Sequence, residues 1–137
     1  MRHFSAFISL AAAAFIAGTA SNAWADRYPT AVFSGLDKIS GQISQFEASA
    51  DKPVRYGSLE ITVRACHKKP PEETPQTSVY VEVHEVSLET KDVDPKPMFK
   101  GWMFAETPGL NGLEHPVYDI WLNTCKGVAA PDAGGNP

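Results

Sequence analysis

The apolar residues of this chain occur in short segments with a period of two, and this pattern constrains the fold more than any other feature. In SLEITVRAC, Leu59, Ile61 and Val63 alternate with polar neighbours, and the valines of SVYVEVHEV do the same. Such alternation is typical of β-strands with one buried face. Beyond residue 25 there is no long apolar stripe of helical period, so the sequence predicts an all-β fold.

A further segment, KISGQISQF, places Ile39, Gly41 and Ile43 at alternate positions. Phe46 then falls out of this phase, and a change of phase within a strand is typical of a β-bulge or a bend. We therefore expect a strand through this segment with an irregularity near Ser44.

Two later segments, KGWMFA and VYDIWLNTC, carry apolar residues on both faces. In the second, Ile120 and Leu122 share one face, and Trp121 lies on the other. Strands that are apolar on both sides belong to the interior of a fold. We expect these two segments to be the most buried part of a sheet.

The segments between these strands are rich in proline, glycine and charged residues, which predicts exposed turns and loops. About five to seven short strands joined in this way are typical of a small β-sandwich or β-barrel. We expect one such domain over residues 32–126, with a flexible N-terminal segment at 26–31. The last segment, residues 127–137, reads GVAAPDAGGNP and is expected to be a disordered tail.

Residues 1–25, MRHFSAFISLAAAAFIAGTASNAWA, have the layout of a secretory signal peptide. A short basic start precedes an uncharged apolar run, and Ala23-Trp24-Ala25 fits the small-x-small pattern of cleavage sites. This pattern follows the apolar run too closely for the run to remain as a membrane anchor. We predict cleavage after Ala25, an exported chain that begins at Asp26, and no stable membrane span after cleavage.

Cys66 and Cys125 are the two cysteines of the chain. In an exported protein an even number of cysteines predicts a disulfide. The bridge would close a loop of about 60 residues and stabilise the fold by about 4 kcal/mol through chain entropy. A redox or metal pair is the alternative, but there is no Cys-x-x-Cys motif, and one distant pair supplies half of a metal site.

Composition argues against several classes of ligand. The net charge of −4 does not supply the basic face that nucleic acids require. No glycine-rich phosphate loop is present, so we expect no nucleotide cofactor. The histidines after residue 25 are not placed at short ligand spacings from one another, so we expect no metal site. They are His67, His84 and His115.

Four residues are candidates for acid–base chemistry: Glu106, Glu114, His115 and Asp119. A carboxylate beside an imidazole can tune its proton transfer, but no serine in a Gly-x-Ser-x-Gly elbow accompanies them. The simpler interpretation is that Glu114 and His115 cap the turn before the last strand. We predict no catalytic residue, and keep a small hydrolase or carbohydrate-binding protein built on residues 107–119 as the alternative function.

The aromatic residues of the two late segments are candidates for a ligand surface. Most of them should be core, but an aromatic side chain in an exposed apolar patch marks a contact surface. A row of exposed aromatic rings would suit a saccharide. The predicted contact surface comprises Trp102, Leu110, Asn111, Glu114, His115 and Trp121.

Three stretches of the chain carry a family resemblance: VFSGLDKISGQISQFEA, VRYGSLEITVRACHKKPPEE and FKGWMFAETPGLNGLEHPVYDIWLNTC. They are similar to an uncharacterised family of small exported proteins, mostly from alphaproteobacteria, known as a domain of unknown function. The resemblance implies a periplasmic location and one disulfide between Cys66 and Cys125, and it supplies no catalytic residues. The resemblance further implies a gene near one for an accessory subunit of the respiratory NADH dehydrogenase, and hence an envelope or respiratory-chain partner.

Export, a disulfide-linked all-β core and the lack of an assembled catalytic set point to one function class. We expect a non-catalytic periplasmic domain that binds another protein or an envelope component. The loop at residues 107–116 is its expected contact surface.

The signal peptide gives the first testable prediction. Cells that express the full chain should release it from the periplasm by osmotic shock, and its N-terminal sequence should begin at Asp26. Edman sequencing or mass spectrometry of the released protein checks this. A chain that stays in the cytoplasmic fraction with Met1 in place would contradict it.

Overall fold

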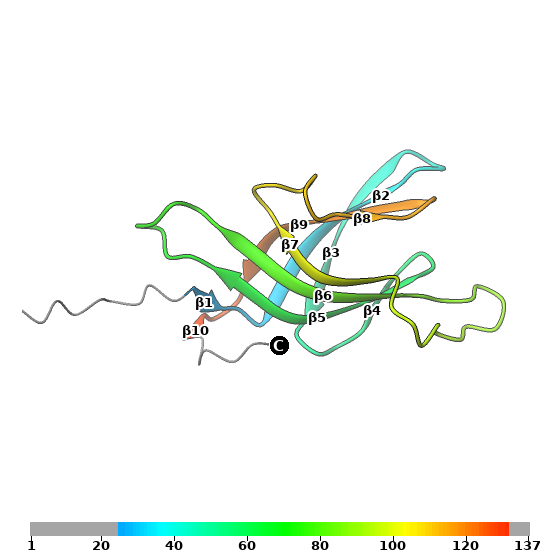
Figure 1. Cartoon of the computed structure of the whole chain (residues 1–137), viewed down its shortest axis with the longest axis horizontal. Coiled ribbons are helices and arrows are strands. Elements are labelled where there is room, and N and C mark those ends of the chain that lie inside the picture. Colours follow the sequence, from blue (N-terminus) through cyan, green and yellow to red (C-terminus); the bar gives the residue numbers. More distant parts are fainter. Residues whose placement is uncertain (1–24, 132–137) are drawn as a thin grey trace, which may run out of the picture.

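The computed structural model describes residues 25–131 and consists of two antiparallel β-sheets that face each other (Figure 1). The expectations for residues 1–24 and 132–137, within the signal peptide and the tail, fall outside the described residues. Between residues 25 and 131 there is no helix long and apolar enough to cross a membrane. The strands of this part are β1 (Asp26–Arg27), β2 (Thr30–Asp37), β3 (Gln42–Ser49), β4 (Val54–Tyr56), β5 (Leu59–Lys68), β6 (Thr77–Glu85), β7 (Phe99–Phe104), β8 (Leu113–Glu114), β9 (Tyr118–Lys126) and β10 (Ala130–Pro131).

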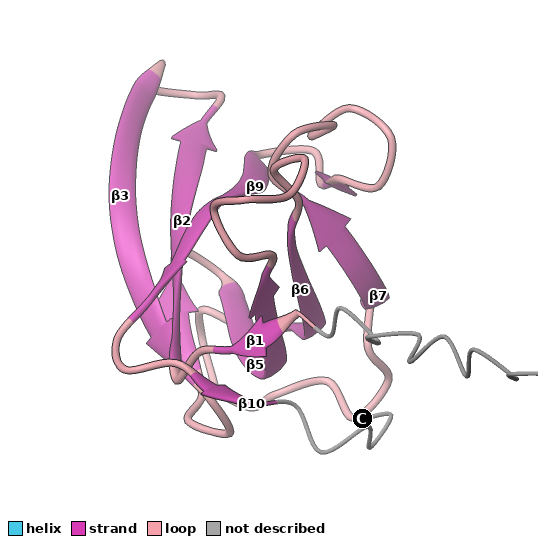
Figure 2. Cartoon of the chain, turned by 90° about the vertical axis from the view of Figure 1, so that its left-hand side faces the viewer, coloured by secondary structure: helices cyan, strands magenta, loops and turns pink. Residues whose placement is uncertain are grey.

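Hydrogen bonding divides these strands into two separate sheets (Figure 2). The first sheet has the order β10-β1-β5-β6-β7, with β4 also paired to β5. The second sheet has the order β3-β2-β9-β8. The predicted all-β fold is therefore confirmed, and of the two predicted architectures the structure is a β-sandwich.

The core lies between the sheets and is built from the inward-facing half of each long strand. On β6, Val79, Val81 and Val83 are fully buried, whereas Tyr80 and Glu82 between them are only partly buried. Burying one such apolar side chain stabilises the fold by about 1.5–3 kcal/mol. The period-two pattern thus identified the core face of this strand correctly.

A β-bulge at Arg64 breaks the simple alternation of β5. The pairing with β6 shifts register between Val63 and Ala65, because Val63 lies opposite Val81 and Ala65 lies opposite Tyr80. A bulge inserts one residue and thereby moves the following side chains to the opposite face. Cys66 consequently points into the core with Val63, although strict alternation would place it on the face of Arg64.

A second β-bulge, at Asn123, has the same effect on β9. Thr124 pairs with Val32 but Leu122 pairs with Phe33, so Asn123 is the extra residue. Its side-chain amide donates a hydrogen bond to Ser34 Oγ at 2.7 Å. After the bulge Cys125 faces the core, where strict alternation from Leu122 would have turned it outward.

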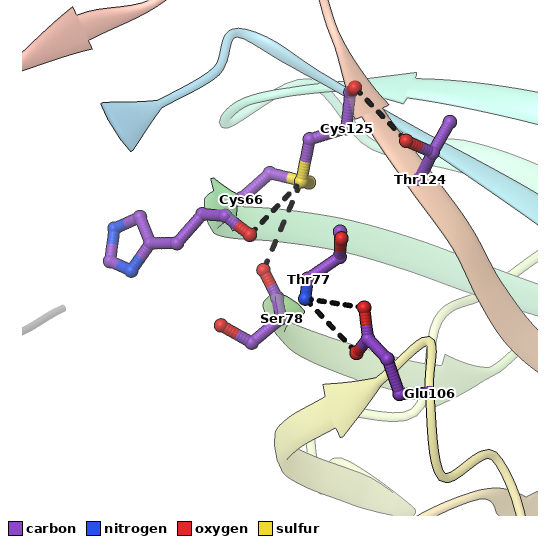
Figure 3. Close-up of a disulfide and its surroundings, with 7 residues drawn as sticks. Cys66, Thr77, Ser78, Glu106, Thr124 and Cys125 are labelled. Carbon is purple, nitrogen blue, oxygen red and sulfur yellow. Dashed lines mark hydrogen bonds between the residues drawn. A yellow bond between two sulfur atoms is a disulfide. The ribbon is translucent and has the colours of Figure 1, made fainter. Parts of the chain in front are cut away.

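The two bulges bring Cys66 and Cys125 together, and the predicted disulfide is confirmed. It joins β5 of the first sheet to β9 of the second, with the two Cα atoms 5.9 Å apart (Figure 3). Cys125 Sγ lies 3.6 Å from the carbonyl oxygen of His67. A disulfide sulfur carries no hydrogen, so this approach is a packing contact. The bridge lies against the backbone carbonyl oxygens of β5 and β6, two neighbouring strands of the first sheet.

The ends of the domain differ from the sequence prediction. Asp26 and Arg27, expected to be flexible, form β1 and pair with both β5 and β10. Ala130 and Pro131, expected to lie in a disordered tail, form β10. The hydrophobic pattern gave no signal for these strands because each is two residues long and is held by backbone hydrogen bonds.

The prediction for KISGQISQF is also wrong in part. Ile39 and Gly41 lie in the turn between β2 and β3, which begins at Gln42. The β2–β3 pairing is continuous from Gln42 to Ser49, without a bulge at Ser44. The phase change has another cause: Ile43 lies on the outer face of the sheet, whereas Phe46 packs inward and stacks on Phe33 with a centroid distance of 5.4 Å.

This turn is closed by polar contacts. Asp37 Oδ1 accepts hydrogen bonds from the backbone N–H groups of Ile39 at 2.8 Å and Ser40 at 3.2 Å. The hydrogen bond from Ile39, and to a smaller extent that from Ser40, lowers the pKa of Asp37 below its ordinary value. Gly41 then adopts a φ of 71°, a conformation that favours glycine.

The two late segments do not form the most buried part of one sheet. They belong to different sheets, and β7 is an edge strand of the first sheet. Met103 of β7 is buried, but Trp102 beside it is only partly buried. The outer face of β7 is apolar because Trp102 packs there on the rings of Tyr80 and His67.

The bulge at Asn123 gives a testable prediction. Deleting Asn123 removes the extra residue and leaves Leu122 and Cys125 two positions apart in a regular strand, so Cys125 should still face the core and the disulfide should form. Deleting Trp121, which pairs with Ser34 in the regular part of β9, is the matched comparison. It puts Ile120 and Leu122 on opposite faces, so the protein should lose about 2–5 kcal/mol of unfolding free energy. Thiol titration and urea unfolding measure both effects. Free thiols in the Asn123 deletion would contradict the assignment of Asn123 as the extra residue.

Candidate functional site

An open groove of about 790 Å³ lies beside the end of the second sheet that carries β8. The loop after β7 and the strands β8 and β9 form its walls. The groove contains three of the predicted contact residues, Leu110, Glu114 and Trp121. Leu110, in the loop at residues 107–116, is 76% exposed. The loop at residues 107–116 therefore does border a surface that is open to solvent.

The polar wall of the groove is built by a cross-strand pair and a lysine. Glu114 of β8 lies opposite Asp119 of β9, and both side chains line the groove. Directly opposed residues have Cβ atoms about 4.5–5.5 Å apart. Lys38, from the β2–β3 turn, forms an ion pair with Asp119 at 2.7 Å and donates a hydrogen bond to the carbonyl oxygen of His115 at 2.8 Å. The lysine offsets one of the two carboxylates, so the groove carries a net negative charge.

His115 does not belong to this groove. Its side chain is 7% exposed, and Nδ1 accepts hydrogen bonds from the backbone N–H groups of Val117 at 3.0 Å and Tyr118 at 3.2 Å. The ring also stacks on Tyr118 with a centroid distance of 5.5 Å. His115 therefore caps the turn before β9, as the simpler sequence interpretation holds.

Glu106 is likewise engaged with backbone. Both of its carboxylate oxygens accept a hydrogen bond from the N–H of Thr77, at 2.9 and 3.0 Å, close to the disulfide (Figure 3). Of the four acid–base candidates, the structure places only Glu114 and Asp119 in one groove. Glu106 and His115 instead accept hydrogen bonds from the backbone at the start of β6 and β9, respectively.

Trp102 lies on the outer face of the first sheet, on a different sheet from Trp121. Its ring meets Tyr80 edge to face at 5.3 Å and lies 5.5 Å from the ring of His67. The predicted contact surface thus divides. Leu110, Glu114 and Trp121 border the groove, the exposed Asn111 shares its loop, and Trp102 belongs to an aromatic cluster elsewhere.

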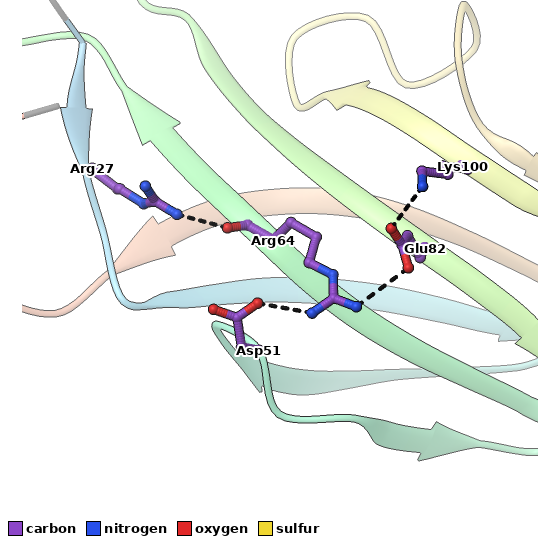
Figure 4. A network of polar contacts seen from close by, with 5 residues as sticks. All are labelled: Arg27, Asp51, Arg64, Glu82 and Lys100. Carbon is purple, nitrogen blue, oxygen red and sulfur yellow. Dashed lines mark hydrogen bonds and ion pairs between the residues drawn. The ribbon is translucent and has the colours of Figure 1, made fainter. Parts of the chain in front are cut away.

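A charged network shares one shallow pocket with Tyr80 of this aromatic cluster. Figure 4 shows the side chains of the network. Arg64 bridges Asp51 at 2.9 Å and Glu82 at 3.3 Å, and Lys100 lies 3.1 Å from Glu82. Arg27 donates a hydrogen bond to the backbone oxygen of Arg64 at 2.8 Å. The network ties β1, β5, β6 and β7 together across the sheet and closes the Arg64 bulge on its outer side.

The network makes the sheet sensitive to acid. The hydrogen bond from Lys100, followed by that from Arg64, lowers the pKa of Glu82 below its ordinary value of 4.5. A carboxyl whose pKa is lowered on folding stabilises the protein above its ordinary pKa. This contribution is lost as the pH falls through the lowered value, so it is present in full at neutral pH.

The outer face of the second sheet is a feature that the sequence analysis missed. Ile43 lies opposite Leu36, and Leu36 lies opposite Asp119, so one row of side chains crosses from β3 towards the groove. Ile43 is 64% exposed. The signal was present in the sequence as the phase change between Ile43 and Phe46, which marks a strand with apolar residues on both faces.

The described residues include no group of three or more histidine, cysteine, aspartate or glutamate side chains arranged to hold a metal ion. The polar wall of the groove consists of the carboxylates of Glu114 and Asp119 and the lysine Lys38. Such a wall can accept and donate hydrogen bonds to a bound ligand.

Comparison with known proteins agrees with the resemblance that the sequence carries. The family described as "Uncharacterized protein conserved in bacteria (DUF2155)" matches residues 31–125. The uncharacterized protein RP359 of Rickettsia prowazekii (strain Madrid E) is 24% identical over 98 residues. The match covers 72% of this chain and 61% of the relative, so the chain spans less than two thirds of the relative's length. No solved structure matches significantly.

The different roles of His115 and Glu114 are testable. Replacing His115 by alanine removes a buried cap and should lower the unfolding free energy by about 1–3 kcal/mol. The neighbouring Glu114→Ala exchange is the matched control and should change it by less than about 0.5 kcal/mol, because Glu114 is exposed. Urea unfolding of both variants decides. Equal stability of the two would contradict the structural role of His115.

Proposed function

We propose that this chain, which belongs to the DUF2155 family of uncharacterized bacterial proteins, is a non-catalytic β-domain that binds another protein of the cell envelope. The groove between the loop at residues 107–112 and strand β9 is its binding site. A respiratory-chain protein is one class of envelope partner that fits this role.

The observation that carries the proposal is an exposed leucine and a half-buried tryptophan beside charged groups. Leu110 and Trp121 line one open groove, and Glu114 and the Lys38–Asp119 ion pair border it. Protein interfaces combine an aromatic or aliphatic anchor with a polar rim in this way. Apolar side chains that lie together and are rimmed by polar groups are typical of an interaction site.

Two of the acid–base candidates accept hydrogen bonds from the backbone, and this supports a binding role over catalysis. A general base must have a free proton-accepting atom within reach of its substrate. His115 Nδ1 accepts from two backbone N–H groups, and both oxygens of Glu106 accept from Thr77. In the described part of the chain these side chains serve the fold.

An envelope location is proposed on two grounds. The N-terminal 25 residues have the composition of a signal peptide. The Cys66–Cys125 disulfide requires an oxidising compartment in which to persist. The periplasm is reached through a signal peptide and is oxidising, so it agrees with both observations.

Site-specific photocrosslinking in living cells tests the proposal. A photoreactive amino acid at position 110 should trap one dominant envelope protein, identified by mass spectrometry. The same residue at position 88 is the matched control, since Leu88 is 62% exposed but lies on the β6–β7 connection outside the groove. The Trp121→Ala exchange should reduce the crosslink from position 110 about tenfold. Equal crosslinking from both positions, or none, would reject a protein partner in the groove.

A saccharide is the second candidate for the groove. Glu114 and Asp119 lie opposite each other, and Trp121 borders the same groove. Carboxylates accept hydrogen bonds from sugar hydroxyls, and an aromatic face stacks on the apolar face of a pyranose ring. The purified protein should then bind cell-wall glycan fragments, with the signal lost in Trp121→Ala and Glu114→Gln. Release of sugar products would instead indicate hydrolysis by the two carboxylates.

A further inference from the structure

The loop that borders the groove contains the dipeptide Asn111-Gly112, in an exposed bend just before β8. Asparagine is among the thermolabile residues of proteins, because its side-chain amide can react with the backbone nitrogen of the next residue. Glycine at that next position favours the reaction, since it has no Cβ and its backbone rotates more freely than that of any other residue. The dipeptide therefore has the composition of a site of spontaneous covalent change.

The fold leaves the reacting atoms of this dipeptide accessible. The side chain of Asn111 is exposed, and within residues 25–131 neither this side chain nor the N–H of Gly112 takes part in a hydrogen bond. The pairing of β8 with β9 includes Leu113 and Glu114 but not Gly112. Segments outside a strand ladder open locally at little cost in free energy. The Gly112 nitrogen can thus approach Cγ of Asn111 while the domain stays folded.

Asn123, the other asparagine between residues 25 and 131, lies in the opposite environment. Its Nδ2 donates a hydrogen bond to Ser34 Oγ at 2.7 Å. The next residue, Thr124, pairs with Val32 in the β2–β9 ladder and has a branched side chain, which restricts rotation further. The fold therefore holds the same reaction back at Asn123.

We infer that Asn111 is a modification site, at which the folded protein deamidates spontaneously. The backbone nitrogen of Gly112 loses its proton to base and attacks Cγ of Asn111. The new N–Cγ bond forms as the Cγ–Nδ2 bond breaks, and ammonia leaves. Water then opens the cyclic succinimide at either of its two carbonyl groups, which yields aspartate or isoaspartate. The balance is one water consumed and one ammonia released, and no oxidant or reductant takes part.

The modification changes the groove in two ways. It adds a carboxylate beside Leu110, on the groove that Glu114 and Asp119 already border, so the negative charge of the groove increases. In isoaspartate the main chain runs through the former side-chain methylene, which lengthens the loop and displaces Leu110 relative to Trp121. The reaction itself needs no partner, and only its effect on binding rests on the proposed function.

Peptide mapping by mass spectrometry tests the inference on the folded full chain, purified from expressing cells and incubated at neutral and at mildly alkaline pH. After reduction, trypsin cleaves at Lys100 and Lys126, so one peptide carries both asparagines and fragment ions distinguish them. Asn111 should gain the mass difference between an amino and a hydroxyl group, in two separable products. The change should be faster at the higher pH, because the attacking nitrogen must lose its proton. Asn123 should stay unmodified over the same period.

The isolated peptide TPGLNGLE, residues 107–114, is the reference for the effect of the fold. Asn111 in the folded protein should react within about tenfold of the rate in this peptide, because the loop opens at little cost. An unmodified Asn111 in the folded protein while the peptide reacts, or equal rates at Asn111 and Asn123, overturns the inference. Both results are obtained on the protein alone, so they do not depend on whether position 110 crosslinks to a partner.

A variant of the neighbouring residue tests which atom attacks. Gly112→Ala keeps the asparagine but adds a Cβ that restricts the rotation of the attacking nitrogen, so the reaction at Asn111 should slow about fivefold or more. Circular dichroism should show an unchanged fold. A rate equal to that of the wild type would contradict attack by the Gly112 nitrogen and overturn the inference.

Discussion

The covalent link between Cys66 and Cys125 is the constraint on which the rest of the sandwich depends. It joins an inner strand of one sheet to an inner strand of the other, across a sequence separation of 59 residues. Closing such a loop removes about 4 kcal/mol of conformational freedom from the unfolded chain. Each cysteine faces the core only because one bulge precedes it on its strand, at Arg64 and Asn123. Two local irregularities therefore determine whether the two sheets can be joined.

Those irregularities also mark the limit of what the sequence predicts. Alternation identified Leu59, Ile61 and Val63 as core, because one face of a strand must be buried. The alternation cannot report a register shift, since a bulge depends on the partner strand. Strict alternation would therefore have placed both cysteines on the outer face, and the bridge was predicted from their even number and from the family resemblance instead. The two-residue strands β1 and β10 left no pattern at all.

At the candidate site, too, the sequence predicted local features but not the contacts between distant segments. The loop at residues 107–116 was recognised from its prolines and glycines, and it does border a groove. The engagement of Glu106 was not predictable, because its partner Thr77 lies 29 residues earlier in the chain. Trp102 and Trp121 were grouped by composition, but the chain places them on different sheets. Local sequence thus indicated which residues were unusual, and the topology determined which of them meet.

The pairing of β2 with β9 affects when the chain can fold. Thr30 lies opposite Lys126, so the second sheet is assembled from the two ends of the domain. Contacts between residues so distant in sequence form slowly, because a large loop must close before they contribute. Until residue 126 is available, β2 lacks its inner partner, and the nascent polypeptide has no complete core to collapse around. Folding of this domain is therefore completed after synthesis of β9 rather than alongside it.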